Sequence, residues 1–305
     1  MNVAVCLVAY KNRDDILACL DALSRSTHAD FSVAICENGG AEAAAALAQA
    51  LPERMPGGQG ITLMSADNPG YAGGVNLCIR ATPDADAWWV LNPDTVPEPD
   101  AMAALVERLR EGDVHCAGSV LYGENRIVQG YAGGWSDAVT RPEMIGRGAP
   151  LDAPVDRSDV EARTGYLIGA SMIVDRAFVE RIGLMRDDYF LYGEEVEWFV
   201  RAKRRGEKLG FAPAARVLHH QGTTTGAVQN DVKAMPKLPI YLNERNKLHV
   251  VRDNAPLMLL SAVPASFLLL FARYARRRAW KQFGWAFQGW LAGLRNERGR
   301  PSWSR

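Results

Sequence analysis

Trp88-Trp89-Val90-Leu91-Asn92-Pro93-Asp94-Thr95 is the stretch from which the fold and the functional site can be worked out. Four apolar residues in a row predict a buried strand, and the Asn-Pro-Asp break ends it. A carboxylate, Asp94, therefore follows the carboxyl end of a strand, where open α/β sheets bind ligands. This position makes Asp94 a candidate for a metal or phosphate site. The alternative is that Asp94 only caps a helix that starts near Glu98.

The chain around this stretch alternates between segments of strand length and segments with helical spacing. We expect strands at 3–9, 31–36, 61–64 and 114–122, and helices at 14–23, 41–51 and 100–110. This alternation is typical of the α/β class, with a mostly parallel central sheet flanked by helices. The segment 123–163 is rich in Gly, Pro and charge, so we expect loops there. Regular structure is expected again at 164–174, 176–182 and 208–212.

The composition bears on partners and on the cellular compartment. The 305 residues include 35 basic and 35 acidic ones, a balance that gives no sign of nucleic-acid binding. Five cysteines form an odd set without the spacing of a zinc site, which favours a reduced, cytosolic compartment. The segment that begins Met1-Asn2-Val3 lacks the basic region and long apolar core of a signal peptide. We therefore expect a cytoplasmic protein.

A glycine cluster, Asn68-Pro-Gly-Tyr-Ala-Gly-Gly-Val-Asn76, is a candidate for anion binding. Glycines let the backbone approach a ligand, and the N–H groups of a helix that opens there favour an anion. The cluster is not a dinucleotide fingerprint, because that pattern follows the first strand, and the turn at 10–12 has no glycine. The same absence argues against a nucleotidyltransferase. A plain loop remains the alternative.

Three carboxylates, Glu194, Glu195 and Glu197, begin a segment with helical spacing. A solvated first turn that gains from the helix dipole would explain them. Aromatic and aliphatic residues surround them, however, and an apolar neighbourhood raises the pKa of a carboxyl group toward the range of a general base. One of these glutamates is thus a candidate base.

Two adjacent histidines, His219 and His220, follow an apolar pair and precede Gly222-Thr-Thr-Thr-Gly226. A lone histidine is more often structural than a ligand. Together with an Asp at the end of a strand, one of them would complete an oxygen and nitrogen set for Mg²⁺ or Mn²⁺.

Taken together and in this order, several segments resemble family 2 glycosyltransferases of the GT-A fold, and among them the rhamnosyltransferase-like branch. The segments are Val8-Ala-Tyr-Lys-Asn12, Glu37-Asn-Gly39, Asn68-Pro-Gly-Tyr-Ala-Gly-Gly-Val-Asn76, Leu91-Asn-Pro-Asp-Thr95, Gly169-Ala-Ser-Met172, Tyr192-Gly-Glu-Glu-Val-Glu197 and His219-His-Gln-Gly-Thr-Thr225. The resemblance covers about 3–250. It implies a Rossmann-like GT-A domain at 1–250, with a nucleotide-binding half at 1–122 and an acceptor half at 164–250.

The resemblance also implies residue roles on the nucleotide side. Tyr10 and Glu37 would hold the base and ribose of a sugar nucleotide. Further contacts to the sugar nucleotide would come from Asn68, Gly70, Gly73, Asn76, Asn92 and Asp94. Glu37 stands where the family more often has Asp, which leaves the nucleotide preference open.

The implied catalytic roles fall on later residues. Asp94 matches the acid of the family's metal-binding motif, and its partner ligand would be His219 or His220, with the spacing to the Gly-Thr-Thr run favouring His219. Glu195 would be the general base, although it too stands where Asp is commoner, so its placement is open. Glu194 and Glu197 are further candidates. Arg245 and Asn246 resemble a pair seen beyond the core, without an assigned role.

The implied activity is inverting transfer of a sugar, with a deoxysugar such as rhamnose among the candidates. The donor would be a dTDP- or UDP-sugar, the acceptor a hydroxyl of a glycan or lipid-linked molecule, and the pathway bacterial surface polysaccharide synthesis. A divalent cation, Mg²⁺ or Mn²⁺, would be the cofactor. The alternative from another class is a non-catalytic protein that binds sugar nucleotides or glycans on the same fold.

The segment 251–305 is expected to form a helical extension. Its run from Ala255 to Phe271 is 17 residues without charge, shorter than the ~20 needed to span a bilayer, and Pro264 interrupts it. Basic residues and tryptophans follow, which suits a helix on the anionic inner face of the cytoplasmic membrane. The competing interpretation is a helical tail that packs on the catalytic domain or on a second subunit in a homodimer.

Overall fold

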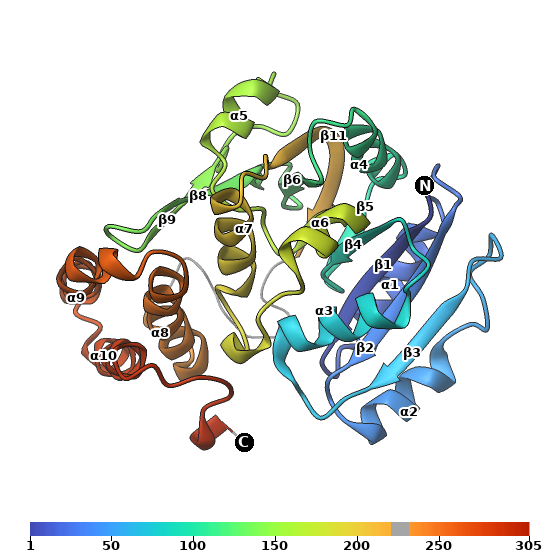
Figure 1. The fold of residues 1–305 in the computed structure, drawn as a ribbon. Coiled ribbons are helices and arrows are strands. Elements are labelled where there is room, and N and C mark those ends of the chain that lie inside the picture. Colours follow the sequence, from blue (N-terminus) through green and yellow to red (C-terminus); the bar gives the residue numbers. More distant parts are fainter. Residues whose placement is uncertain (221–231, 305) are drawn as a thin grey trace.

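The computed structural model describes residues 1–220 and 232–304, which fold around one mixed β-sheet (Figure 1). In spatial order its strands are β3 (Ile61–Ser65), β2 (Phe31–Glu37), β1 (Val3–Ala9), β4 (Ala87–Leu91), β10 (Ser171–Asp175), β6 (Cys116–Tyr122), β11 (Gly210–His219) and β5 (Thr95–Pro97), with β7 (Val128–Gly130) paired to β6. Strands β3, β2, β1 and β4 are parallel to one another. Strand β10 runs antiparallel between β4 and β6. The α/β class expected from the sequence is thus confirmed.

Strand β4 explains why the opening stretch is apolar without alternation. Ala87, Trp89 and Leu91 point into one core of the protein, whereas Trp88 and Val90 point into the other. A strand covered on both faces needs apolar side chains at every position. The Trp89 indole also donates a hydrogen bond of 3.0 Å to the Ser171 hydroxyl, which ties β4 to β10 inside the sheet.

Helices cover both faces of the sheet (Figure 1). The first core contains side chains from α1 (Arg13–Leu23), α2 (Ala41–Ala50) and α4 (Ala101–Arg110). The second core contains side chains from α3 (Gly70–Ala81), α6 (Arg176–Ile182) and α7 (Glu194–Arg204). All five cysteines are buried and none forms a disulfide within the described residues.

The segment expected to be loops, 123–163, instead contains regular structure. A hairpin forms from β8 (Ala132–Ser136) and β9 (Arg141–Ile145), and α5 (Arg157–Arg163) follows it. These elements have a small core of their own, in which the ring of Tyr131 lies 5.2 Å from that of Phe211 on β11. The prediction was wrong because such short elements form through tertiary contacts, which local sequence patterns do not reveal.

Two details of the sheet bear on Asp94. Helix α4 begins at Ala101 with Asp100 at its N-cap position, so Asp94 is not the cap of that helix. Strand β11 is longer than the expected 208–212, because it continues past a register shift to His219. There it pairs with β5, and His219 lies opposite Thr95.

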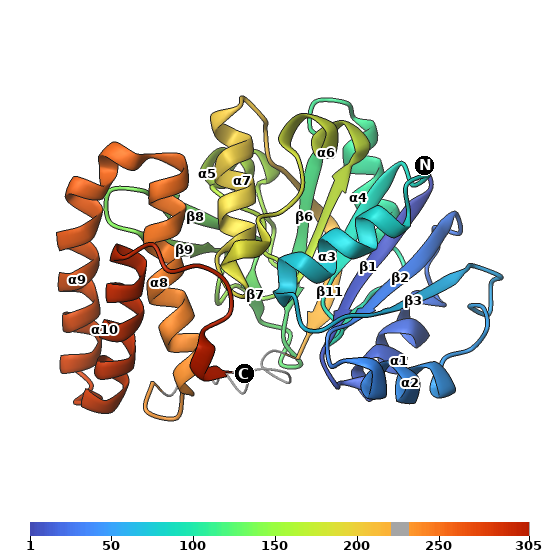
Figure 2. The same ribbon diagram turned by 60° about the horizontal axis from the view of Figure 1, so that its bottom comes forward.

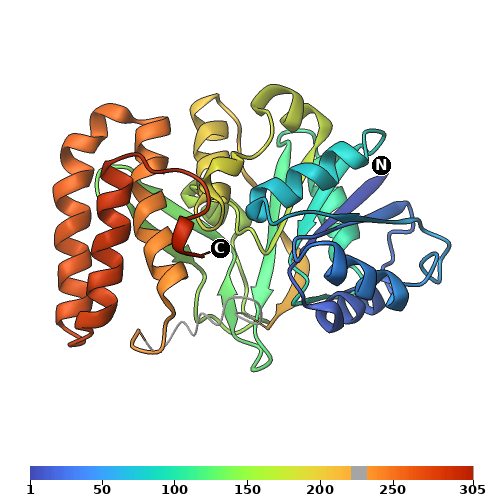
Figure 3. The same ribbon diagram turned by 90° about the horizontal axis from the view of Figure 1, so that it is seen from below.

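The C-terminal part forms three helices, α8 (Lys237–Asn254), α9 (Leu259–Ala275) and α10 (Trp280–Leu294). They lie side by side at one end of the molecule, with α1 and α2 at the other end (Figures 2 and 3). Helix α8 runs through residue 250, the domain boundary expected from the sequence. The helical segment Pro256–Ala275 has 20 residues and contains an 18-residue window with a mean hydropathy of 1.7, so by length and composition it could cross a membrane. The expectation that it is too short is therefore wrong, since the helix extends beyond the uncharged run.

Gly70, at the start of α3, lies where a larger residue does not fit. Its φ is +82°, and a Cβ added there would lie 2.1 Å from the carbonyl oxygen of Phe190. Gly58 has a similar φ of +86° with open space around it.

We expect Gly58→Ala to cost about 1–2 kcal/mol of unfolding free energy, the left-handed penalty alone. Gly70→Ala should cost more than about 4 kcal/mol, because the clash adds to that penalty. Denaturant titration measures both, and equal losses would contradict the close contact.

Candidate active site

The candidate residues Tyr10, Glu37 and Asp94 lie at one edge of the sheet. Tyr10 follows β1, Glu37 ends β2, and Asp94 lies three residues beyond β4. Because these strands are parallel neighbours, their carboxyl ends meet at the same edge, where ligands bind in such sheets.

Glu37 organises the turn after β1. Its Oε1 accepts hydrogen bonds from the backbone N–H groups of Lys11 at 3.0 Å and Gly39 at 2.7 Å, and the side chain is buried. Tyr10 is 40% exposed at the same edge, so its ring is open to a ligand. The structure thus brings Glu37 and the turn that carries Tyr10 together.

The glycine cluster forms the turn before α3 and the first residues of that helix. Asn68 has a φ of +45° and precedes the helix, and the Asn38 amide donates to the Gly70 carbonyl at 2.9 Å. At Gly73 a Cβ would lie 2.6 Å from Pro69, so the turn packs closely on its own helix. Asn76 points elsewhere: its side chain exchanges hydrogen bonds of 2.8 and 3.1 Å with the backbone of Met185. We therefore give Asn76 a structural role.

Tyr71 connects the end of β4 to the helix that carries the glutamates. Its hydroxyl lies 2.7 Å from the carbonyl oxygen of Gly169 and 3.0 Å from Oδ1 of Asn92. Gly169 in turn lies against the side chain of Glu195. Burial, followed by the charges of Glu194, Glu195 and Asp94, raises the pKa of Tyr71 well above its ordinary value. Tyr71 was not among the candidates from the sequence; its place directly after Gly70 is the one signal that pointed to it.

Asp94 and His219 come together through the pairing of β5 with β11. The Nε2 of His219 lies 3.5 Å from Oδ1 of Asp94, and both side chains are mostly buried. The backbone also contributes, because the N–H of His220 donates to the Asp94 carbonyl at 3.0 Å. The side chain of His220 is directed to Glu124, 3.3 Å away, so His219 is the histidine that faces Asp94. The Gly-Thr-Thr run after these histidines lies outside the described residues.

Gln129 fixes the ring of His219 and was not suspected from the sequence. Its Nε2 donates to the His219 carbonyl at 2.7 Å, which leaves its Oε1 to face Nδ1 of the ring at 3.0 Å. An amide oxygen can only accept, so Nδ1 of His219 carries a proton, and a neutral ring of this tautomer would present the Nε2 lone pair toward Asp94. This arrangement is the one that a metal-ligating histidine requires.

A carboxylate oxygen and an imidazole nitrogen suit Mn²⁺ or Mg²⁺. Within residues 1–220 and 232–304, no three His, Cys, Asp or Glu side chains gather into a site able to hold a metal ion. A cation held by two protein ligands would take its others from water and from a phosphate-bearing molecule, as Mg²⁺ commonly does.

The two carboxyl groups of Glu194 and Glu195 begin α7 and differ in their surroundings. Oε2 of Glu195 accepts from the N–H of Gly193 at 3.2 Å, whereas no described group bonds the buried Oε2 of Glu194. Burial raises the pKa of both groups, and the charge of Glu195 raises that of Glu194 further. Glu195 thus ionises first, because backbone N–H groups at the helix start stabilise its charge. The pKa of Glu194 is raised well above its ordinary value, first by burial and then by the charge of Glu195.

The loop that leads into these glutamates is strained. Phe190 and Tyr192 have φ values of +69° and +68°, a conformation that costs of order 1–3 kcal/mol for each such residue. The side chains of Arg245 and Asn246 on α8 stabilise the loop by donating to the Tyr189 carbonyl at 2.8 and 3.1 Å. Arg245 is fully buried, so its role is to hold this loop rather than to contact a ligand.

Glu197, the third glutamate, has a structural partner. It is 1% exposed and forms an ion pair of 2.8 Å with Arg201 one turn later on α7. Arg201 also donates to the Leu184 carbonyl at 2.9 Å. Glu197 therefore stabilises the contact between α7 and the segment that follows α6.

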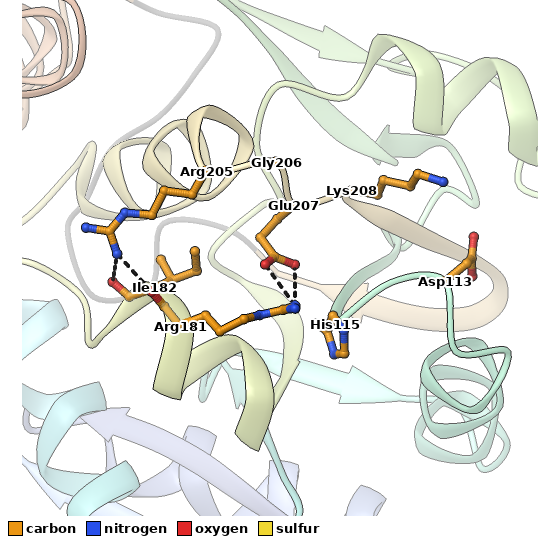
Figure 4. A pocket seen from close by; sticks show the side chains of 8 residues that line it. All are labelled: Asp113, His115, Arg181, Ile182, Arg205, Gly206, Glu207 and Lys208. Carbon is orange, nitrogen blue, oxygen red and sulfur yellow. Dashed lines mark hydrogen bonds and ion pairs between the residues drawn. The ribbon is translucent and has the colours of Figure 1, made fainter.

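A hollow of about 420 Å³ lies at the opposite edge of the sheet, near the starts of β6 and β11 (Figure 4). Its polar groups interact with one another: Arg181 pairs with Glu207 at 2.8 Å, and Arg205 donates to the Arg181 carbonyl at 2.9 Å. None of the candidate residues from the sequence lines it. We therefore place the candidate active site at the carboxyl edge and not at this hollow.

Comparison with known proteins gives a family match for most of the chain. Residues 1–234 match the family model described as "Glycosyltransferase like family 2". The N-acetylglucosaminyl-diphospho-decaprenol L-rhamnosyltransferase of Mycobacterium tuberculosis is 26% identical over 246 residues, which are 73% of this chain and 77% of the relative. The low-salt glycan biosynthesis hexosyltransferase Agl10 of Haloferax volcanii is 22% identical over 187 residues, 60% of this chain and 57% of that protein.

Two solved structures share the fold. GalNAc-T7 with UDP, GalNAc and Mn²⁺ superposes with a TM-score of 0.63 at 12% identity, covering 83% of this chain and 48% of the other. The mannosyltransferase PcManGT from Pyrobaculum calidifontis, in complex with GDP-Man and Mn²⁺, superposes with a TM-score of 0.56 at 14% identity. This match covers 97% of this chain and 88% of the other.

The buried Glu194 makes stability depend on pH. Because its pKa is raised in the folded state, its contribution to stability is lost as pH rises from the ordinary value of 4.5 toward the folded value. Gln resembles the protonated acid and does not titrate. Glu194→Gln should therefore gain stability relative to the native protein as pH rises, by up to about 1.4 kcal/mol per pH unit.

Denaturant titrations at pH 5 and pH 8 measure this difference, with the exposed Glu53→Gln as the matched control. If the unfolding free energies of Glu194→Gln and the native protein differ by the same amount at both pH values, the raised pKa of Glu194 is contradicted.

Proposed function

The chain belongs to glycosyltransferase family 2 and has the GT-A fold, and from this we propose an inverting, metal-dependent transfer of a sugar. The donor would be a nucleoside diphosphate sugar and the acceptor a hydroxyl of a lipid-linked glycan. The observation that carries the proposal is the Asp94–His219 pair at the carboxyl edge of the sheet, which Tyr71 and Gly169 connect to Glu195.

In this mechanism Glu195 accepts the proton of the acceptor hydroxyl. The acceptor oxygen bonds to the anomeric carbon from the face opposite the diphosphate, and the bond from that carbon to the diphosphate oxygen breaks. Burial raises the pKa of Glu195, which makes its carboxylate a stronger base than an exposed one. A divalent cation held by Asp94 and His219 would neutralise charge on the leaving diphosphate.

The other residues of the edge would position the donor. Tyr10 offers an exposed ring to the base, and the turn held by Glu37 lies beside it. The turn at Asn68 leads into α3, and Gly70 and Gly73 let this turn pack closely on the Phe190 carbonyl and on Pro69, which would fix its position beside the donor. Tyr71 orients Asn92, which directly follows β4 and precedes Asp94 by two residues.

The relatives suggest the substrate class. The name of the Mycobacterium tuberculosis relative describes an L-rhamnose transfer to a diphospho-decaprenol carrier, and that of the Haloferax protein a hexose transfer in glycan biosynthesis. By analogy we propose a deoxysugar such as rhamnose as the transferred sugar, in the synthesis of a surface polysaccharide. Since the two solved neighbours hold UDP and GDP-Man with Mn²⁺, we propose Mn²⁺ or Mg²⁺ as the cofactor here.

Glu195→Gln should lower kcat by about 10² to 10⁴, because the amide cannot accept the proton, while donor affinity stays near that of the native enzyme. Release of nucleoside diphosphate in the presence of acceptor measures kcat. In the native enzyme the acid limb of kcat/KM should lie above pH 4.5, because the raised pKa of Glu195 must be exceeded before the base ionises.

Glu195→Asp is the control, because it keeps a carboxylate and should retain more activity than the Gln variant. Normal turnover by Glu195→Gln would remove Glu195 from the role of base. Donor binding without any release of nucleoside diphosphate by the native protein would favour a non-catalytic binding protein.

His219→Ala and His220→Ala form a matched pair for the metal site. His219 faces Asp94, so its loss should weaken Mn²⁺-dependent binding of the nucleoside diphosphate by about tenfold or more, as loss of a supporting metal contact does. His220 is directed to Glu124, and its loss should leave this binding unchanged. Calorimetry with and without Mn²⁺ measures both. Equal losses, or none, would contradict the assignment of His219.

A further inference from the structure

The outer face of α9 is an apolar stripe that no described part of the chain covers. Four of its members recur every three or four residues and so lie on one face of the helix: Leu260, Pro264, Leu268 and Phe271. Leu257 precedes them in the short 3-10 helix Pro256–Met258. Leu257 is 83% exposed, Leu260 86% and Leu268 64%. The opposite face of α9 is buried at Ala262, Ser266, Leu270 and Tyr274. Soluble proteins seldom expose such a continuous apolar surface without a binding partner.

A basic cluster lies at one end of this stripe, around the turn between α9 and α10. It consists of Arg273, Arg276, Arg277, Arg278 and Lys281, and Trp280 beside it is 57% exposed. The sequence has no Asp or Glu from 254 to 296, whereas the whole chain has equal numbers of basic and acidic residues. The rest of the chain is therefore net acidic, and the segment 254–296 is basic.

We infer that the stripe and the basic cluster together dock the protein on the surface of a membrane that contains anionic phospholipid. The apolar side chains enter the boundary between headgroups and acyl chains, the arginines contact lipid phosphates, and Trp280 lies at the interface. A second copy of the chain fits this surface less well, because the same segment of that copy brings no acidic side chain to neutralise the cluster.

The contacts of α9 favour docking along the surface over crossing the bilayer. The Trp290 indole on α10 donates to the Ser266 hydroxyl at 3.0 Å, and Arg273 lies 3.9 Å from Glu244 on α8. Insertion of α9 across the bilayer would separate it from α8, which carries buried charged groups such as Glu244 and Arg245. This inference goes beyond the proposed sugar transfer, since it concerns a surface on the far helices.

The test is flotation of the full chain with vesicles, without donor or acceptor, so that its outcome does not depend on sugar transfer. Vesicles of phosphatidylcholine alone are compared with vesicles that also contain phosphatidylglycerol. The native protein should partition to the anionic vesicles only. Arg276→Gln/Arg277→Gln/Arg278→Gln should bind about 10²-fold more weakly, because each basic residue near an anionic surface contributes roughly a factor of five. Leu260→Gln/Leu268→Gln should bind at least about tenfold more weakly.

The matched control is Arg80→Gln/Arg110→Gln/Arg147→Gln, which removes the same charge from exposed positions outside the C-terminal helices and should bind as the native protein does. Equal binding to both kinds of vesicle, or an equal loss in the control, would overturn the inference. So would a dimer in solution that the leucine substitutions dissociate, because the stripe would then belong to a second copy. Resistance to alkaline extraction from the vesicles would indicate a spanning helix and would also overturn it.

Discussion

The pairing of β5 with the end of β11 is the interaction on which the candidate active site depends. Strand β5 has three residues, too few to be stable alone, and it is held by Val217, Leu218 and His219. The pairing reverses the chain after Asp94 and directs that carboxylate to His219. Two residues far apart in the sequence thereby become one O- and N-donor set. The long, shifted strand β11 is what brings the histidine to this place.

A second constraint acts at the start of α7, where the buried Glu194 and the half-buried Glu195 lie next to each other. Water screens their charges poorly, so a charge on both groups at once is costly. The backbone decides which one, because N–H groups face Glu195 and not the buried Oε2 of Glu194. The strained loop at Phe190 and Tyr192 sets this geometry. The position of the backbone thus decides which of the two glutamates carries the charge.

The sequence predicted the parallel half of the sheet well because periodicity is local information. The apolar runs of β1, β2 and β4 mark strands that are buried on both faces, and the resemblance then ordered the site residues along the chain. What could not be predicted depends on contacts between distant segments. Gln129 lies on a short strand within a stretch rich in glycine and charge, and its contact with His219 follows only from the pairing of β7 with β6. The antiparallel β10 and the hairpin of β8 and β9 depend on tertiary packing in the same way.

Helix α8 and the loop before α7 form one structural unit, because side chains of α8 bind the carbonyl groups of that loop. The family match ends at residue 234, yet the amide of Asn246 is shared among the carbonyls of Tyr189, Leu191 and Tyr192 at 2.6 to 3.1 Å. Arg245 bonds one of the same carbonyls and also that of Gly299. A chimaera joined at 234 would take these donors away from the loop that positions Glu195. Exchange of specificity between relatives must therefore carry α8 and its partner helices along with the catalytic core.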